Sequence, residues 1–120
     1  MNKRAVGSRY EALAVRYLQN NGVKVLERNF RNRGGEIDII GKEGACFVFF
    51  EVKYRKDGAA GLPAEAVDLR KQTTICRVAD YYRITHGLTG EQSFRFDIIA
   101  VLGEKITWYK NAFEYRQYYK

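Results

Sequence analysis

Two acidic residues and a lysine stand at the ends of two neighbouring apolar segments. Asp38 lies in "GEIDII", and Glu51 and Lys53 end "ACFVFFEVK". Charged side chains on strands are costly unless they reach water or a partner. Carboxylates are the ligands that Mg²⁺ takes from proteins, together with waters and substrate phosphate oxygens. A bound Mg²⁺ can activate a water and stabilise the charge that develops at phosphorus. Lys53 shares a strand face with Glu51 and can orient that water or meet the phosphate.

A tight turn between the two segments gathers the acids at one end of a hairpin. The turn "KEGA" contains Gly44, which permits the positive φ of a two-residue turn. With Glu43 and Gly44 at the centre, Glu36 lies opposite Glu51, and Asp38 is the diagonal neighbour of Glu51 at roughly 7–8 Å. A turn centred one residue later places Asp38 directly opposite Glu51. In either register the carboxylates repel each other unless one takes up a proton or a cation lies between them.

The same charges have two other interpretations. They could form an ion-pair network at the strand ends, or the basic side chains could bind an anion without a metal. Spacing alone leaves all three interpretations open. Later in the chain Arg95 and Asp97 flank Phe96, and we expect a structural ion pair there rather than support for the site. In the ion-pair interpretation, the network at the strand ends would comprise Glu36, Asp38, Glu51, Lys53, Arg55 and Arg95.

Hydrophobic periodicity predicts the elements that position these residues. Apolar residues spaced by three and four predict a helix over 5–20, and a second apolar stripe predicts a helix that ends near 85–87. The order α-β-β-β-α-β-β predicts a mixed sheet with helices packed on it, in the α/β or α+β class. Apolar, β-prone runs predict strands over 23–30, 35–40, 45–55, 93–103 and 105–110.

Two details connect these elements to the site. On the first helix Glu11 borders the apolar stripe, so it can point along the sheet as a further acidic ligand or as a partner of the ligands. The segment 56–63 is predicted to be a loop, and Pro63 suits the first turn of the helix that follows.

Length and composition fit a single domain over residues 1–120, with 46% hydrophobic residues to supply a core. No apolar run approaches the roughly 18 residues of a membrane span, and the N-terminus lacks the apolar region of a signal peptide. Cys46 and Cys76 lack the close spacing of zinc ligands and are interpreted as buried free thiols. These features predict a cytoplasmic protein.

The net charge of +7 is concentrated near the N-terminus, where residues 1–33 hold eight basic residues against Glu11 and Glu27. An uneven basic surface is typical of nucleic-acid binding, although a solvated face that aids solubility has the same composition.

Several short motifs in a fixed order carry a resemblance to known proteins. Asp38 with "EVK" (51–53) resembles the PD-(D/E)xK nuclease superfamily, and Glu11 is similar to the helix acid of archaeal Holliday-junction resolvases. More closely, nearly the whole chain resembles the YraN-like family of endonuclease-like bacterial proteins. The matching segments are "GSRYEALAVRYL" (7–18), "NFR" (29–31), "GEIDII" (35–40), "FFEVKYR" (49–55), "AVDLRKQ" (66–72), "RFDIIAV" (95–101) and "NAF" (111–113).

The resemblance implies a restriction-endonuclease-like α/β fold and a phosphodiesterase site that depends on Mg²⁺ or Mn²⁺. In that site Asp38 and Glu51 would be metal ligands, Lys53 the catalytic lysine and Glu11 the helix acid. Glu36 lies on the same face as Asp38, which leaves open which of these two acids binds the metal.

The resemblance also implies supporting residues. Related nucleases often place a Lys or Gln near the start of the second helix close to the site, which here implies Lys71 and Gln72. Arg31 and Arg33, beside the pair Gly34-Gly35, resemble a phosphate-contacting loop, with a plain flexible turn as the alternative.

We therefore expect an endonuclease-like protein that acts on DNA phosphodiester bonds. A compact chain has little surface for reading sequence, which favours recognition of branched, flapped or single-stranded DNA. The alternatives are a nucleic-acid-binding module that does not cut, and a structural adaptor whose basic face meets an acidic protein. A homodimer would supply the two sites that symmetric cutting of a four-way junction needs. The residues expected to grip the DNA are Arg9, Arg31, Arg33 and Arg55.

Overall fold

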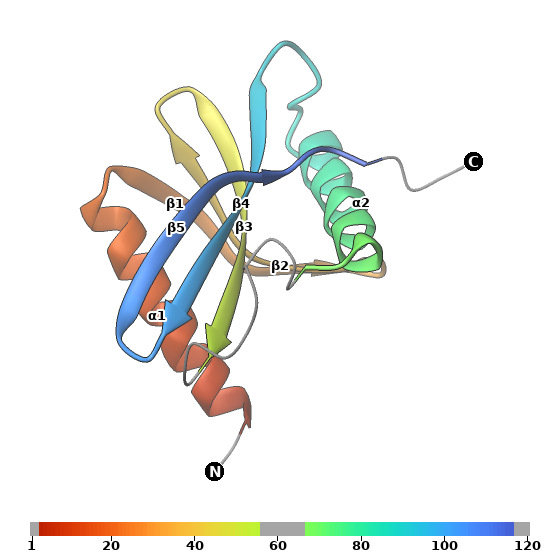
Figure 1. The fold of residues 1–120 in the computed structure, drawn as a ribbon. Coiled ribbons are helices and arrows are strands. Elements are labelled where there is room, and N and C mark those ends of the chain that lie inside the picture. Colours follow the sequence, from red (N-terminus) through yellow and green to blue (C-terminus); the bar gives the residue numbers. More distant parts are fainter. Residues whose placement is uncertain (1–2, 56–66, 117–120) are drawn as a thin grey trace.

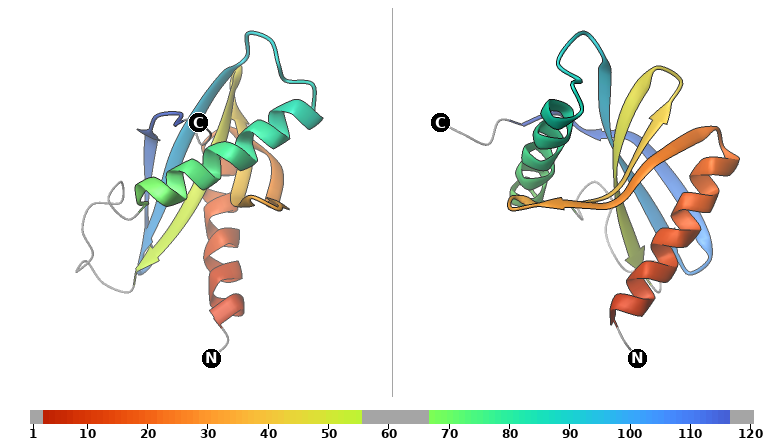
Figure 2. Two further views of the ribbon diagram at one scale, coloured as in Figure 1. Left: turned by 90° about the vertical axis from the view of Figure 1, so that its right-hand side faces the viewer. Right: turned by 180° about the vertical axis from the view of Figure 1, so that it is seen from behind.

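A five-stranded mixed sheet with one helix on each face makes up the structure (Figures 1 and 2). The computed structural model describes residues 3–55 and 67–116, with their side chains from residue 7 onward. The predicted order and the mixed sheet are confirmed, whereas the predicted loop over 56–63, with Pro63, lies outside the described residues. The elements are α1 (Lys3–Asn20), β1 (Val23–Asn32), β2 (Gly35–Glu43), β3 (Cys46–Arg55), α2 (Leu69–Thr85), β4 (Ser93–Leu102) and β5 (Lys105–Phe113).

The strands lie in the order β1-β2-β3-β4-β5. β3 and β4 pair in parallel, and the other neighbours pair antiparallel. Parallel partners require a long crossover, and here the connection from β3 to β4 contains α2. Strands covered on both faces are apolar on both faces. Phe49 accordingly belongs to a core with Tyr82 of α2, and the next residue, Phe50, to a core with Ala14 and Leu18 of α1.

The turn between β2 and β3 corrects the first of the two predicted registers. Glu43 pairs with Cys46, so Gly44 and Ala45 are the central turn residues. Gly44 has a φ of 60°, and a positive φ at the first central position is the type II′ pattern that glycine favours. The register centred on Glu43 and Gly44 is therefore wrong. The register shifted by one residue holds, and its continuation places Asp38 opposite Glu51.

The tip of the β1–β2 hairpin leaves the rest of the sheet and reaches α2 (Figure 2). A Cβ atom on Gly34 would lie 2.8 Å from Cδ of Arg77, and one on Gly35 would overlap the methyl group of Thr74. Gly35 also has a φ of 147°, which other residues rarely adopt. Close packing on α2 thus accounts for the glycine pair.

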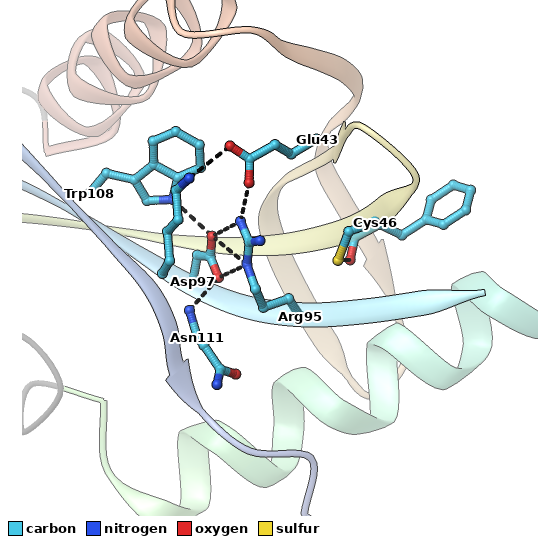
Figure 3. Close-up of polar contacts among 8 residues, drawn as sticks. Glu43, Cys46, Arg95, Asp97, Trp108 and Asn111 are labelled. Carbon is cyan, nitrogen blue, oxygen red and sulfur yellow. Dashed lines mark hydrogen bonds and ion pairs between the residues drawn. The ribbon is translucent and has the colours of Figure 1, made fainter. Parts of the chain in front are cut away.

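A buried polar network joins β4 and β5 at the end of the sheet near the β2–β3 turn (Figure 3). Asp97 is 0% exposed. It accepts hydrogen bonds from Arg95 Nε at 2.9 Å, from Trp108 Nε1 at 2.8 Å and from the backbone N–H of Asn111 at 2.8 Å. Arg95 Nη2 bridges Asp97 and Glu43, with 2.8 Å to each. The structural ion pair expected for Arg95 and Asp97 is present.

The exposed edge of this network is held by Lys110, whose Nζ lies 2.9 Å from Glu43 Oε2. The hydrogen bond from Lys110, followed by that from Arg95, lowers the pKa of Glu43. The hydrogen bond to Asp97 raises the pKa of Arg95. Both charges therefore persist at neutral pH.

Two expectations from composition can be compared with the structure. Within residues 3–55 and 67–116, no helix is both long and apolar enough to cross a membrane. Cys46 and Cys76 are free thiols, as expected, but Cys76 is buried whereas Cys46 is half-buried.

Replacing Asp97 with alanine should destabilise the fold strongly. Arg95, Trp108 and the Asn111 N–H would lose their acceptor inside the protein, a loss that typically costs about 3–5 kcal/mol. Urea unfolding followed by circular dichroism measures this change. The matched control is Lys110→Ala, which removes a half-exposed pair (Lys110 is 51% exposed) and should cost about 1 kcal/mol or less. Equal losses in the two variants would contradict the assignment.

Candidate functional site

The candidate site lies where β2 and β3 separate. Their pairing ends at Ile39 and Phe50, and beyond this point the β1–β2 hairpin turns toward α2 while β3 continues beside β4 (Figure 1). The backbone N–H of Val52 then donates to Oδ2 of Asp38 at 2.8 Å. A carboxylate thus replaces a strand partner at the point where the sheet divides. We call this region the fork. It comprises Asp38 on β2, Glu51 on β3 and the charged side chains that gather around these two acids.

Glu51 is the buried acid of the fork, with 5% of its surface exposed. Burial, and next the negative charge of Asp38, raise the pKa of Glu51 to about 8. Two ammonium groups partly oppose this shift, since Lys53 Nζ lies 3.6 Å and Lys71 Nζ 3.7 Å from Glu51 Oε2. Lys53 comes from the same strand and Lys71 from the first turn of α2. A strongly shifted carboxyl between two lysines is typical of functional sites.

A second group of carboxylates shares the fork. One carboxylate oxygen each from Glu11, Glu36 and Asp38 lie within 4.8 Å of one another. Glu11 comes from α1, on which it was expected to border the apolar stripe. Burial and the charge of Asp38 raise the pKa of Glu11. Glu36 is paired with Arg31, whose Nη2 lies 3.5 Å from Glu36 Oε1.

Asn29 is a site residue that sequence reasoning missed. It lies on β1 between the pairs Arg28↔Ile39 and Phe30↔Ile37, and therefore opposite Asp38. Its φ of 53° is left-handed, a conformation that asparagine tolerates better than most residues. Its side chain hydrogen-bonds to Glu11 and so favours the ionised acid. Asparagine is depleted in strands, and its place inside a strand pattern was the available signal.

The donor set at the fork fits a divalent cation. Around an octahedral Mg²⁺ with ligands at about 2.0–2.1 Å, neighbouring oxygens lie roughly 3 Å apart and opposite ones about 4 Å apart. Glu11, Glu36 and Asp38 need only small side-chain movements to reach those separations from within 4.8 Å. Glu51 contacts the same Asp38 from the other side. Asp38 is thus the acid common to both groups.

The supporting residues implied for α2 have different surroundings. Lys71 reaches Glu51 and belongs to the fork. The Gln72 side chain instead donates to the backbone carbonyl of Val67 at 2.9 Å. The N–H of Lys71 donates to Asp68 Oδ1 at 2.8 Å, which makes Asp68 the N-cap of α2. Gln72 therefore stabilises the start of the helix rather than contacting the carboxylates.

The basic residues expected to contact DNA lie around the fork on three elements. Arg9 on α1 lies beside Tyr10, whose ring stacks on that of Tyr54 with a centroid distance of 3.7 Å. Arg55 ends β3 and donates from Nη1 to the Tyr54 carbonyl at 2.9 Å. Arg31 and Arg33 are exposed at the hairpin tip. Of these four, Arg31 is paired with an acid of the fork, Glu36.

The fold and the residues of the fork indicate the class of protein, and sequence similarity identifies its family. The class is an α/β protein whose mixed sheet carries an acid on β2 and an acid-x-lysine sequence on β3. The chain belongs to the uncharacterised protein family UPF0102, whose family model matches residues 10–101, and the resemblance to the YraN-like family is confirmed.

Curated relatives match over almost their whole length. UPF0102 proteins of Marinobacter nauticus and Lachnoclostridium phytofermentans are each 42% identical to this chain, over 92% and 95% of it and 94% and 97% of their own lengths. One from Photobacterium profundum is 44% identical over 93% of this chain and 92% of its own.

A solved structure is also similar. The crystal structure of a repair endonuclease from Pyrococcus abyssi matches 77% of this chain with a TM-score of 0.47 and 22% identity. This chain spans 38% of that endonuclease.

Replacing Glu51 with glutamine should change how stability depends on pH. The raised pKa means that the protonated carboxyl stabilises the fold at low pH and that its ionisation costs stability as the pH rises from about 4.5 to about 8. Glutamine stays neutral throughout. In EDTA, the Tm of Glu51→Gln minus that of the wild type should therefore increase by several degrees between pH 5 and pH 9. All other groups titrate in both proteins, and a constant Tm difference would contradict the burial of this charge.

Proposed function

We propose that this protein is a cytoplasmic, metal-dependent endonuclease-like protein that cuts DNA phosphodiester bonds. The observation that supports this proposal best is the convergence at the fork: three carboxylates within 4.8 Å of one another beside a buried glutamate that faces two lysines. Carboxylates can bind a cation, lysines can bind a phosphate, and a glutamate with a raised pKa can accept or donate a proton. Their concentration at one point of a basic protein favours phosphodiester chemistry over an ion-pair network.

The proposed metal ligands are Asp38 and Glu51, with Glu11 and Glu36 completing or supporting the set. When bound, Mg²⁺ or Mn²⁺ would activate water and stabilise the charge that develops at phosphorus. Asp38 has a fixed orientation because one of its oxygens accepts the Val52 N–H. The side chain is thus held in place before any ion binds, which favours function.

Lys53 is proposed as the catalytic lysine. Its ammonium group lies 3.6 Å from Glu51 and its side chain is 27% exposed, so Lys53 can contact both the acid and a substrate. From this position it can donate to a phosphate oxygen or orient the attacking water. Lys71, 41% exposed, lies beyond Glu51 and can neutralise the phosphate from α2.

The proposed substrate is DNA of particular structure rather than sequence. Arg9 on α1, Arg33 in the β1–β2 turn and Arg55 at the end of β3 are exposed. Such side chains neutralise phosphates without reading bases. Branched, flapped or single-stranded DNA would be selected by shape, and a homodimer would be needed for symmetric cutting of a four-way junction.

Titration with Mn²⁺ or Mg²⁺ should raise the Tm of the wild type. At a concentration of 100 times Kd the stabilisation would be about 2.7 kcal/mol. Asp38→Asn should lose most of this response, because it removes a charged ligand while its amide oxygen can still accept the Val52 N–H. Glu104→Gln, an exposed acid in the β4–β5 turn, is the matched control and should respond as the wild type does. A flat response in all three would favour the adaptor alternative.

Cleavage should require Lys53. With Mn²⁺ present, the wild type should cut at least one member of a panel of single-stranded, flapped and four-way DNA, and Lys53→Ala should lose roughly 100-fold or more of that rate, as is usual for loss of a catalytic group. Denaturing gel electrophoresis of labelled DNA measures this. Lys105→Ala removes an exposed lysine at the β4–β5 turn and should keep full activity. Tight DNA binding without any cutting would favour the binding module instead.

A further inference from the structure

A pocket of about 240 Å³ lies between the C-terminal half of α2 and the end of β5. It is lined by polar and charged residues, which include Asp80, Arg83 and Glu114, and by five aromatic residues of β3, β4, β5 and the segment after β5: Phe49, Phe94, Phe96, Phe113 and Tyr115. The phenyl rings form an ordered stack, since Phe49 and Phe94 are 11° from parallel, and Phe96 and Phe113 are 19° from parallel. Phe49 and Phe96 are almost wholly buried, so the accessible aromatic surface of the pocket comes from Phe94, Phe113 and Tyr115.

Arg83 of α2 lines this pocket, and 31% of its side chain is exposed. Its guanidinium group lies over the Phe94 ring, 4.2 Å from the centroid, and its Nη1 lies 3.4 Å from Asp80 Oδ1. Its Nε is buried and has no hydrogen-bond partner among the residues the structure describes. A buried unpaired donor is rare and costly. The exposed part of the Arg83 side chain can donate to an acceptor on a bound ligand.

The wall formed by β5 is shaped by an irregularity in the sheet. Between the pairs Phe96↔Phe113 and Ile98↔Tyr109 the register shifts, and Asn111 within the shifted segment has a left-handed φ of 54°. The Asn111 N–H is held by Asp97 of the buried network (Figure 3). Bulges of this kind redirect a strand and are frequent next to functional sites.

The redirected strand reaches α2. The end of β5 crosses toward α2 (Figure 1), and Tyr115 just beyond it donates from its hydroxyl to Asp80 Oδ2 at 2.6 Å. The Asp97 network therefore supports the outer wall of the pocket.

We propose that this pocket binds a single nucleobase of a single-stranded nucleic acid. Bases stack on aromatic rings and on guanidinium planes, and their edges carry acceptors that can pair with the guanidinium group of Arg83. The volume is below the roughly 300–1,000 Å³ of pockets for drug-sized ligands, which fits one ring system. Asp80 and Glu114 line the same pocket and disfavour a phosphate inside it, so the backbone stays outside.

A base fits these features better than an aromatic side chain of a protein partner. Phenylalanine has no acceptor, and the indole of tryptophan is a donor only, so neither would accept a hydrogen bond from Arg83. The chain's net charge of +7 attracts a polyanion. The pocket binds the base by stacking and one hydrogen bond, whatever the sequence of the strand.

This inference rests on the proposed function for its choice of nucleic acid. α2 runs from Lys71 at the fork to Arg83 at the pocket, which is about 18 Å along a helix axis. A strand lying across both would span several nucleotides, within the roughly 4–16 nucleotides that single-strand-binding folds cover. The pocket would hold the strand while the fork meets a phosphodiester further along.

The test compares the binding of an oligonucleotide that has bases with the binding of one that has none. Both are measured in EDTA, so that no cleavage occurs. The probes are a fluorescein-labelled oligothymidine of roughly ten nucleotides and a labelled abasic oligomer of the same length. Fluorescence anisotropy measures the affinity of the protein for each. The wild type should bind the oligothymidine at least fivefold more tightly. Arg83→Lys keeps the charge but removes the flat donor group, and should abolish most of this preference with little change for the abasic oligomer. Arg70→Lys, on the exposed face of α2, is the matched control and should keep the preference.

A second measurement locates the binding. Thymidine added to ¹⁵N-labelled protein should shift the amide signals of Ala79, Arg83 and Phe113 while leaving that of Asp38 unchanged. Equal binding of the two oligomers, an unaltered preference in Arg83→Lys, or binding of free tyrosine in place of thymidine would each overturn the inference. Base-dependent binding without metal-dependent cutting would overturn the proposed function and leave the pocket assignment intact.

Discussion

The separation of β2 from β3 is the constraint on which the rest of the structure depends. The two strands pair as far as Ile39 and Phe50, and the Asp38 carboxylate then accepts the Val52 N–H that has no strand partner. This hydrogen bond replaces the pairing of β2 with β3 at that point and fixes the orientation of the Asp38 carboxylate. The opening leaves room for side chains from both faces of the sheet, which a continuous ladder would have excluded.

Each helix contributes to that opening from its own side. α1 supplies Glu11, and α2 supplies Lys71 while it packs against the glycines of the β1–β2 tip. Burial and the charge of Asp38 raise the pKa of Glu11 and of Glu51, and such crowded carboxylates would destabilise an isolated hairpin. Apolar contacts of Phe49 and Phe50 with the two helices hold the strands in place despite this repulsion. The fold therefore offsets a local electrostatic cost, as functional sites commonly require.

Much of the fold could be predicted because its signals are local. The helix α1, the apolar strands β3 and β4 and their order all follow from periodicity and run length. The error in the β2–β3 register arose because two turn positions suit the local sequence about equally well. Gly44 suits either central position of a two-residue turn, and only the pairing of Glu43 with Cys46 decides between them. Asn29 and Asn111 are both left-handed within β-strands. Asparagine inside a strand pattern was a signal, but the conformation and contacts of these residues depend on partners from other elements.

The sequence by itself determined the element order, the acids on β2 and β3 and the lysine that follows, because strand alternation and turn length are short-range properties. The tertiary structure alone decided which charges meet. It brought Glu11 to Asp38 and Lys71 to Glu51, and it placed Arg83 over the Phe94 ring. These contacts join residues of different elements, and their energies depend on burial and on the approach of whole elements, which no local pattern encodes.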